Sequence, residues 1–339
     1  MTDHLETSPH PDFHPRTIVG TWPVSLWALG AQEGFPPLAH FDGRGWQTVA
    51  TLERGRTFGG FKMSDWRKGA VLVGETAVDL DHDGRMTGKL RAYGGPDPAP
   101  LPTDESGRNV IVQVYELAGF ESGHAIVLGT TGPELGGGAG AVFLWDPSQR
   151  HPTVRVIPDA AGYYGALFAP SPDDLVVSGY QRMSTSANAA ACWRLKADNW
   201  QRIDMPPGAV ARSYAQQRDG TEWVVIDGDR SRPGPADDDS HLWRREPGRP
   251  WQQVVLPTPE TARIKLDPMP TAHEVRVWDD DSVWVEASYF EDCDRGMIVS
   301  TRQPASLCLM GDKQGCMPPD QEAPVTHLCD WMLTDRKAR

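Results

Sequence analysis

The chain has 339 residues, of which 39% are hydrophobic, and it contains 34 glycines, 30 prolines and 13 tryptophans, with a formal net charge of −13. The negative charge disfavours nucleic acid as a partner, because binding to the phosphate backbone requires a positive surface. No run of about 18 apolar residues occurs, so the sequence predicts neither a membrane span nor a membrane partner.

Residues 1–15 are polar and lack the apolar centre of a signal peptide. We therefore expect a disordered tail at this end, a cytoplasmic location and a monomeric protein.

Tryptophan-containing segments recur at a regular spacing along the rest of the chain. Trp200 and Trp251 each begin the pattern W-Q-x-[VI] and are 51 residues apart. Trp46 begins a third copy 154 residues before Trp200, about three times that spacing, so two more units should lie between them. Apolar-Pro endings that fit the same spacing occur at Pro102, Pro158 and Pro318.

Two further apolar runs repeat within each unit, separated by turn residues such as Asp-Gly. This arrangement is typical of short antiparallel strands joined by hairpins. The expected second strands end at Gly30, Gly74, Gly129, Gly179, Gly228 and, in a degenerate copy, Ser288. The expected third strands end at Phe41, Tyr93, Trp145, Leu195, Arg245 and Met310.

Six copies of a four-stranded meander predict an all-β fold, a single β-propeller with six four-stranded blades. One meander cannot bury both of its faces, so the blades should pack face to face. A solenoid of sheets is the alternative, although the unit is long for one of its coils. The propeller is expected to span 16–335, with blades at 16–53, 54–103, 106–158, 160–207, 209–257 and 271–319. Residues 325–333 are expected to close the ring as a terminal strand.

The repeated order of a strand ending in glycine, a Leu-Trp-Arg strand and a Trp-Gln strand ending in Leu-Pro resembles Trp-rich propeller repeats of bacterial proteins. These are related in style to kelch, Asp-box and photosystem-assembly-factor propellers. The resemblance implies the fold but no activity, because such families include enzymes, lectin-like binders and assembly factors. The segment from Asp42 to Trp46 only partly matches the Asp-box pattern, so sialidase chemistry is not implied.

The connection between the second and third strands of the second unit contains alternating carboxylates at Asp79, Asp81 and Asp83, followed by Gly84. Alternating oxygen ligands around a tight turn suit Ca²⁺, and the segment resembles the start of an EF-hand loop and the calcium loops of integrin-type propellers. Leu90 stands where the closing acid of an EF-hand would be. The alternatives are a calcium site and a solvated acidic turn.

Arginines stand at or near the start of the expected first strands, which would line a central channel. Guanidinium groups from several blades could bind a carboxylate or phosphate there, or could instead pair with acids between the blades. Tyr163 and Tyr164 take this place in the fourth unit and would present aromatic rings at the channel mouth. The arginines are Arg16, Arg56, Arg108, Arg212 and Arg276.

The sixth unit departs from the repeat, because its second strand lacks the terminal glycine. We expect a long loop there, with Glu291 and Asp292 either as ligand-binding residues or as solvated side chains. Cys293 lies between two aspartates, which disfavours a reactive thiolate. Whether Cys293 and the later cysteines are buried thiols or local disulfides is left open, and their spacing matches no zinc site; these later cysteines are Cys308, Cys316 and Cys329.

No G-x-S-x-G, H-E-x-x-H or phosphate-loop motif occurs in the chain. The favoured interpretation is a non-catalytic scaffold whose loops around the channel mouth bind a protein or a small ligand. The alternatives are a propeller lyase, hydrolase or cyclase that uses the arginines and a divalent metal, and a calcium-stabilised structural propeller.

Overall fold

The computed structural model describes residues 15–21, 25–30, 36–42, 44–52, 61–67, 69–79, 85–95, 113–131, 140–149, 152–159, 162–184, 187–228, 240–255, 271–277, 281, 283–290, 293–300 and 307–310. All the regular elements within these ranges are β-strands. In the same ranges no helix has the length and apolar character needed to cross a membrane.

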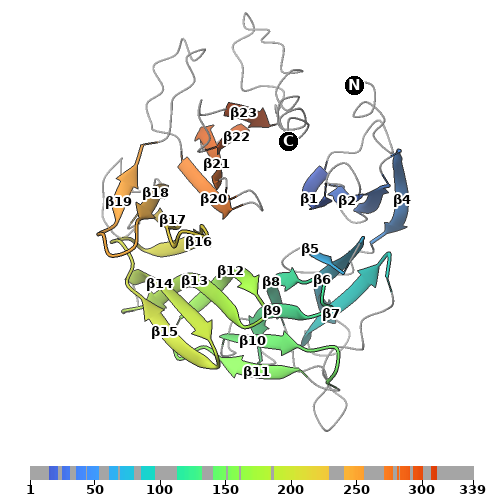
Figure 1. The fold of residues 1–339 in the computed structure, drawn as a ribbon, viewed down its shortest axis with the longest axis horizontal. Helices are drawn as coiled ribbons and strands as arrows, with labels where there is room; N and C mark the ends of the chain where they lie inside the picture. The colour runs from blue at the N-terminus through green and yellow to red at the C-terminus, as the bar shows by residue number, and fades with distance from the viewer. Residues whose placement is uncertain are drawn as a thin grey trace, which may run out of the picture. The chain divides into compact units, whose positions relative to one another are not determined.

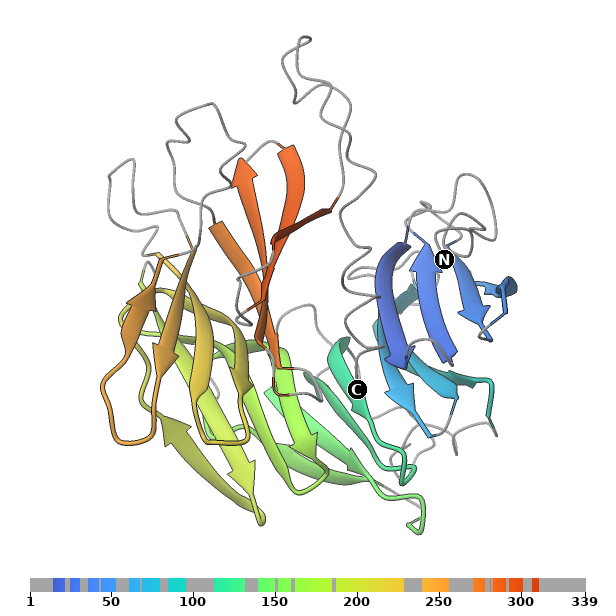
Figure 2. The ribbon, with the colours of Figure 1, turned by 45° about the horizontal axis from the view of Figure 1, so that its top comes forward.

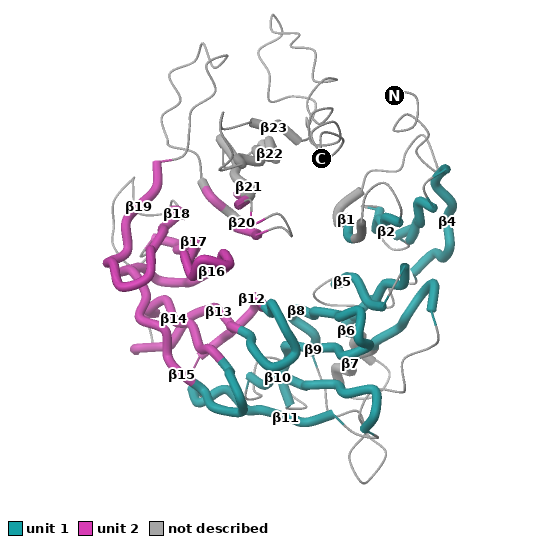
Figure 3. The backbone as a smooth tube through the Cα atoms, viewed as in Figure 1, with its two compact units in different colours: residues 1–160, 169–175, 195–200 teal, residues 161–168, 176–194, 201–339 magenta. Residues whose placement is uncertain are grey.

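The chain divides into two compact units, which are described separately (Figure 3). The first unit comprises residues 1–160, 169–175 and 195–200, and the second comprises 161–168, 176–194 and 201–339.

Three sheets lie within the first unit, and in each of them every strand pairs antiparallel with the next along the chain (Figure 1). The first contains β1 (Pro15–Thr21), β2 (Ser25–Gly30), β3 (Pro37–Phe41) and β4 (Trp46–Thr51). The second contains β5 (Phe61–Trp66), β6 (Ala70–Asp79) and β7 (Arg85–Tyr93). The third contains β8 (Gln113–Gly119), β9 (Ala125–Thr130), β10 (Gly140–Trp145) and β11 (Thr153–Val156).

The remaining strands follow the same meander order. One sheet contains β12 (Tyr163–Ser171), β13 (Asp174–Arg182), β14 (Asn188–Lys196) and β15 (Asn199–Ile203). The next contains β16 (Val210–Gln216), β17 (Glu222–Asp227), β18 (Ser240–Arg245) and β19 (Gln252–Val254). The last contains β20 (Thr271–Val277), β21 (Val283–Phe290), β22 (Cys293–Ser300) and β23 (Leu307–Met310), and Figure 2 shows β20 to β22 side by side in orange.

The prediction of an all-β chain built from antiparallel meanders is confirmed. The number of blades and the closure of a ring stay predictions, and the expected closing strand at 325–333 lies outside the described residues.

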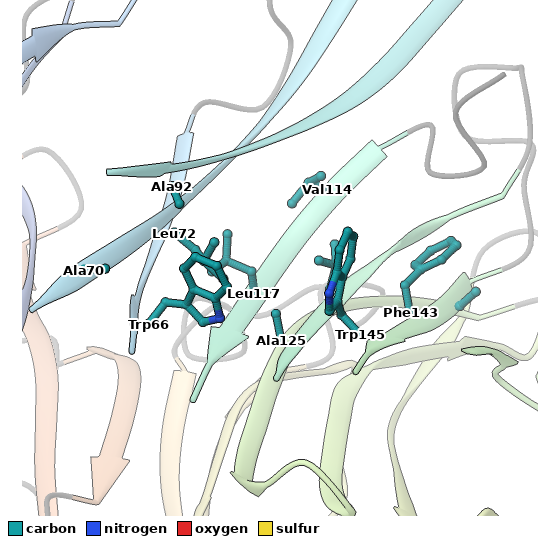
Figure 4. Close-up of a cluster of buried hydrophobic side chains, with 11 residues drawn as sticks. Trp66, Ala70, Leu72, Ala92, Val114, Leu117, Ala125, Phe143 and Trp145 are labelled. Carbon is teal, nitrogen blue, oxygen red and sulfur yellow. The ribbon is translucent and has the colours of Figure 1, made fainter. Parts of the chain in front are cut away.

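Neighbouring sheets within the first unit pack face to face through apolar side chains. Trp66 of β5 and Leu72 of β6 belong to one buried cluster with Leu117 of β8 and Phe143 of β10 (Figure 4). Burying one such side chain stabilises a fold by about 1.5–3 kcal/mol. Each meander therefore depends on its neighbour for the burial of its inner face.

The first strands of the second and third sheets approach each other more closely than side chains on both strands would allow. The backbone N–H of Gly119 on β8 donates to the Ser64 hydroxyl on β5 at 2.9 Å. A Cβ atom on Gly119 would lie 2.1 Å from the carbonyl oxygen of Asp65. Glycine is therefore required at residue 119 by the spacing between β5 and β8.

The expected acidic loop of the second unit is largely strand. β6 continues past Gly74 to Asp79, which pairs with Arg85 at the start of β7. The expectation that the second strand ends at Gly74 was wrong, because residues 75–79 keep the extended backbone pairing of the hairpin. Asp81 and Asp83 lie outside the described residues.

In the sixth unit the prediction missed one strand, β22, so the strand after it was numbered one too low. The expected long loop after Ser288 is instead the end of β21 followed by β22, in which Phe290 pairs with Cys293. The run ending at Met310, expected as a third strand, is the fourth strand β23, which pairs with β22. The apolar run from Gly296 to Val299 forms ladder bonds on both sides and is therefore a central strand.

We expect Gly119→Ala to lower the free energy of unfolding by about 1–3 kcal/mol, because the added methyl group must displace the β5 backbone. Denaturant unfolding of the full chain measures this change. Gly45→Ala is the matched control, since a Cβ there meets nothing within 4 Å, and should change stability by less than about 1 kcal/mol. Equal effects of the two substitutions would contradict the close approach.

Candidate functional site

One-residue bulges recur near the start of the first strand in several sheets. The strand register shifts in β1, β8, β16 and β20, and in each case the ladder skips one residue of the first strand. A bulge redirects a side chain away from the regular alternation of a strand, and bulges are common beside binding sites. The bulged residues are Arg16, Tyr115, Arg212 and His273.

The predicted arginines do not share one position. Arg16 is the second residue of β1 and Arg212 the third residue of β16, as expected. Arg276 was expected at the start of a strand, which is wrong: it is the sixth of the seven residues of β20 and lies near the turn into β21. Its Nε donates to Glu274 at 2.7 Å. Arg56 and Arg108 lie outside the described residues.

Arg212 is held by a polar cluster built from three strands of one sheet. Its Nε donates to Oδ1 of Asp227 at the end of β17, and the hydroxyl of Ser240 at the start of β18 donates to the same oxygen. Asp227 and Ser240 are buried, whereas 41% of the Arg212 side chain is exposed. The cluster fixes one edge of the guanidinium and leaves part of the group in solvent.

Tyr163 forms an aromatic platform at the corresponding end of the preceding sheet. Its ring stacks on that of Tyr180 with a centroid separation of 5.7 Å and an angle of 27°. A Cβ on Gly165 would lie 3.1 Å from Cε1 of Tyr163, so the ring rests over the bare backbone of this glycine. With 43% of Tyr163 exposed, the platform combines a fixed position with an accessible surface.

Tyr164 is not part of this surface. Its side chain is only 2% exposed, and its hydroxyl accepts a hydrogen bond from Nε1 of Trp193 at 2.9 Å. The expectation that both tyrosines face a ligand was wrong because consecutive residues of a strand point to opposite sides.

Two residues of the platform region were missed by the sequence analysis. Tyr180 follows Gly179, which was taken as the end of a strand, and Met183 begins the connection after β13. The backbone N–H of Met183 donates to the carbonyl of Ala187 at 2.9 Å, closing a tight hairpin, and 64% of Met183 is exposed. The only sequence signal was two large side chains within four residues after Gly179.

The predicted metal site and acidic loop are not tested. Asp79 is the last residue of β6, and Asp81, Asp83, Glu291 and Asp292 lie outside the described ranges. Within those ranges, no three His, Cys, Asp or Glu side chains gather closely enough to hold a metal ion.

The strand register separates two of the cysteines whose state was left open. Cys308 pairs with Ile298, five positions along β22 from Cys293. Five residues of strand span about 16 Å, whereas a disulfide requires Cα atoms within about 7 Å. A bond between Cys293 and Cys308 is therefore excluded.

A second polar cluster lies at the opposite end of the sheet formed by β16 to β19. The Tyr214 hydroxyl donates to Oε1 of Glu222 at 2.6 Å, and Nε of Arg245 donates to Oε2 at 2.7 Å. The Arg245 guanidinium also stacks over Trp251 and donates to the carbonyl of Asp204. Each member has a partner, so this cluster stabilises the sheet rather than offering a site.

A hollow of about 10 Å³ lies between Leu52, Phe61, Glu75 and Tyr93 in the first unit. This volume has room for about one water molecule, so it is too small for an organic ligand.

No protein-family model matches the sequence, and no curated protein matches it. Solved structures are similar in fold. The β-propeller domain of the trilobed protease from Pyrococcus furiosus has 8% sequence identity, and the alignment covers 88% of this chain and 86% of that one with a TM-score of 0.54.

Two enzymes show a comparable likeness. A PL25 ulvan lyase is 12% identical over 90% of this chain and 80% of its own, with a TM-score of 0.53. The GH74 xyloglucanase from Xanthomonas campestris is 11% identical over 84% of this chain but only 44% of its own, also with a TM-score of 0.53. At these identities the likeness shows the β-propeller fold alone.

We expect the free energy of unfolding to fall as the pH rises above about 10, in part because of Tyr214. Burial, with the Glu222 carboxylate beside it, raises the pKa of the Tyr214 hydroxyl. The unfolded chain therefore loses this proton first, so the contribution is complete below the unfolded pKa and is lost at higher pH. Tyr214→Phe should reduce the decline by up to about 1.4 kcal/mol per pH unit.

Denaturant unfolding between pH 8 and 11 measures this decline. The comparison is made in a Cys192→Ala background, because burial also raises the pKa of that thiol. Parallel curves for the tyrosine and phenylalanine proteins would contradict the assignment.

Proposed function

We propose that the protein is a non-catalytic binding scaffold, and that its partner is a protein that docks where β12 and β16 begin. The observation that carries the proposal is the Tyr163 ring, half exposed yet held by Tyr180 and Gly165. A rigid aromatic side chain offers a large contact area and loses little conformational entropy on binding. Tyrosine is also among the residues that most often dominate the energy of protein interfaces.

The character of the surrounding surface supports a macromolecular partner. Met183 adds an exposed, flexible apolar side chain of the kind that adapts to protein surfaces. A fixed, exposed aromatic ring and an exposed methionine suit contact with a protein surface.

The enzyme alternative has less support. Two of the residues expected in its site are separated from it, since Arg276 lies at the far end of its strand and Tyr164 is buried. The similar folds include the β-propeller domain of a protease, a polysaccharide lyase and a xyloglucanase. That range argues that the residues at the site, rather than the fold, decide the function.

We further propose that the sheets form a six-bladed ring closed by residues 325–333. The period of 51 residues between Trp200 and Trp251 and the recurring meander order support the blade count. Closure would remove the exposed strand edges that otherwise favour aggregation.

Replacing both Tyr163 and Met183 with alanine should weaken binding of the partner by about tenfold or more, since each exposed anchor contributes about 1 kcal/mol or more. The full chain, immobilised, first identifies a protein that binds in a defined stoichiometry. The affinities of the native and variant chains for this protein are then measured by calorimetry.

The matched control replaces Val49 and Val156, two exposed apolar residues of outer strands in the first unit. This variant should bind as the native chain does. Equal affinities for all three proteins would refute the proposed docking surface, and a binding loss confined to the control would place the interface elsewhere.

Removal of residues 325–339 should lower the melting temperature by more than about 2 °C, because loss of a paired strand costs more than about 1 kcal/mol. Removal of residues 1–14 serves as the control and should leave it unchanged. Equal melting temperatures for the two truncated chains would argue against closure by 325–333.

A further inference from the structure

We propose that Arg212 and the residues that hold it form a binding site for a single oxyanion group, a carboxylate or a phosphate, carried by the partner. The inference deepens the proposed binding function and rests on it. It is carried by four features of the second unit: the bulge, the buried carboxylate, the exposed guanidinium and the neighbouring platform.

The bulge places Arg212 outside the regular alternation of β16. Ala211 pairs with Ile226 and Ser213 with Val225, so Arg212 is the extra residue between two ladder positions. The next residue is fixed, because the Ser213 hydroxyl accepts from the N–H of Val275 and donates to its carbonyl at 3.2 and 3.1 Å. The backbone that carries Arg212 is thus held by the neighbouring sheet.

The guanidinium is oriented by a carboxylate that is itself anchored. Asp227 is 7% exposed, and its Oδ1 accepts from both Arg212 and Ser240. A buried carboxylate costs several kcal/mol unless its hydrogen bonds are satisfied, so these contacts are tightly coupled. The side chain of Arg212 therefore has fewer accessible rotamers than a free surface arginine, so binding a ligand would cost little further conformational entropy.

The exposed part of Arg212 is chemically suited to an oxyanion. A guanidinium has five N–H donors in a planar fork, and Asp227 contacts Nε, one of these five. With 41% of the side chain exposed, solvent reaches the group beyond the Asp227 contact. A fork of this kind binds the paired oxygens of a carboxylate or phosphate.

Arg212 and the Tyr163 platform belong to sheets joined at this end. The N–H of Ala190 on β14 donates to the carbonyl of Gly208 at 2.8 Å, and the N–H of Ala209 donates to the carbonyl of Asp227 at 2.9 Å. The short segment between β15 and β16 thereby connects the end of one sheet to the cluster of the other. A partner that covers the platform can therefore present its oxyanion to Arg212.

The net charge of −13 limits what the site accepts. At low ionic strength the field of the molecule repels polyanions over about 10 Å or more, whereas a direct contact with a guanidinium is screened much less. The chemistry thus favours one acidic group on a partner that is otherwise neutral or basic.

The test uses the full chain, labelled with ¹⁵N, and follows the arginine Nε–H signals by NMR as acetate, inorganic phosphate or acetamide is added. The Arg212 signal is identified by its loss in the Arg212→Lys protein. We expect acetate or phosphate to shift this signal saturably and neutral acetamide to leave it in place. The anion with the lower dissociation constant identifies the source, a carboxylate or a phosphate.

The exposed Arg249, in the turn between β18 and β19, serves as the control for nonspecific anion effects. Ser240→Ala should weaken acetate or phosphate binding at least threefold while the chain stays folded, because Asp227 loses one of its two anchors. Absence of a saturable shift, or equal shifts of the Arg249 and Arg212 signals, would overturn the oxyanion site.

The oxyanion site and the docking surface can fail separately. If Tyr163→Ala/Met183→Ala abolishes partner binding while no anion shifts the Arg212 signal, the scaffold function stands and the oxyanion site is refuted. If anions bind at Arg212 but Tyr163→Ala/Met183→Ala leaves the affinity for the partner unchanged, the docking surface is refuted and the oxyanion site stands.

Discussion

The structure depends on the close approach of first strands in neighbouring sheets. In the first unit the Gly119 backbone lies so near Asp65 that no Cβ fits, and hydroxyls replace ladder bonds between the sheets. Thr76 on β6, the second strand of its sheet, accepts from the N–H of Val114 at 2.9 Å, and Ser213 on the first strand β16 accepts from the N–H of Val275 in the second unit. These hydroxyls satisfy buried backbone groups that would otherwise cost about 1–3 kcal/mol each.

This constraint also positions the candidate site. A strand whose backbone is tied to its neighbour can carry a bulge without losing its register, and Ser213 follows the bulged Arg212 directly. The position of a binding side chain on such a strand is more accurate than on a long loop. The Tyr163 platform follows the same logic, because Gly165 and Tyr180 fix the ring from the strands rather than from a connection.

Sequence periodicity predicted the meander because the Trp-Gln strands and glycine-ended strands report local hairpin chemistry, which depends on few long-range contacts. The sequence periodicity failed to predict features that depend on the pairing register of the strands. Arg276 and Arg212 look alike in sequence, yet the ladder places them at opposite ends of their strands. Likewise β22 was read as a loop, since only pairing on both sides identifies it as a strand. Tyr180 and Met183 were missed because their role comes from the Tyr163 ring and the hairpin, not from a motif.

The sheet formed by β16 to β19 carries an arginine–carboxylate pair at each end, and the pairs differ in what else surrounds the guanidinium. Arg245 contacts Glu222, Trp251 and the carbonyl of Asp204, so its side chain is 20% exposed. Arg212 contacts Asp227 through Nε, and its exposure is twice as large. Removing Arg245 would leave the partly buried Glu222 carboxylate without its charge partner, which is a stability effect. Removing Arg212 would also lower stability through the loss of its contact with Asp227. The N–H groups of Arg212 that face solvent do not take part in that contact. A guanidinium whose position is fixed while its outer part stays hydrated is therefore suited to bind a ligand, and this difference separates the proposed binding end of the sheet from its structural end.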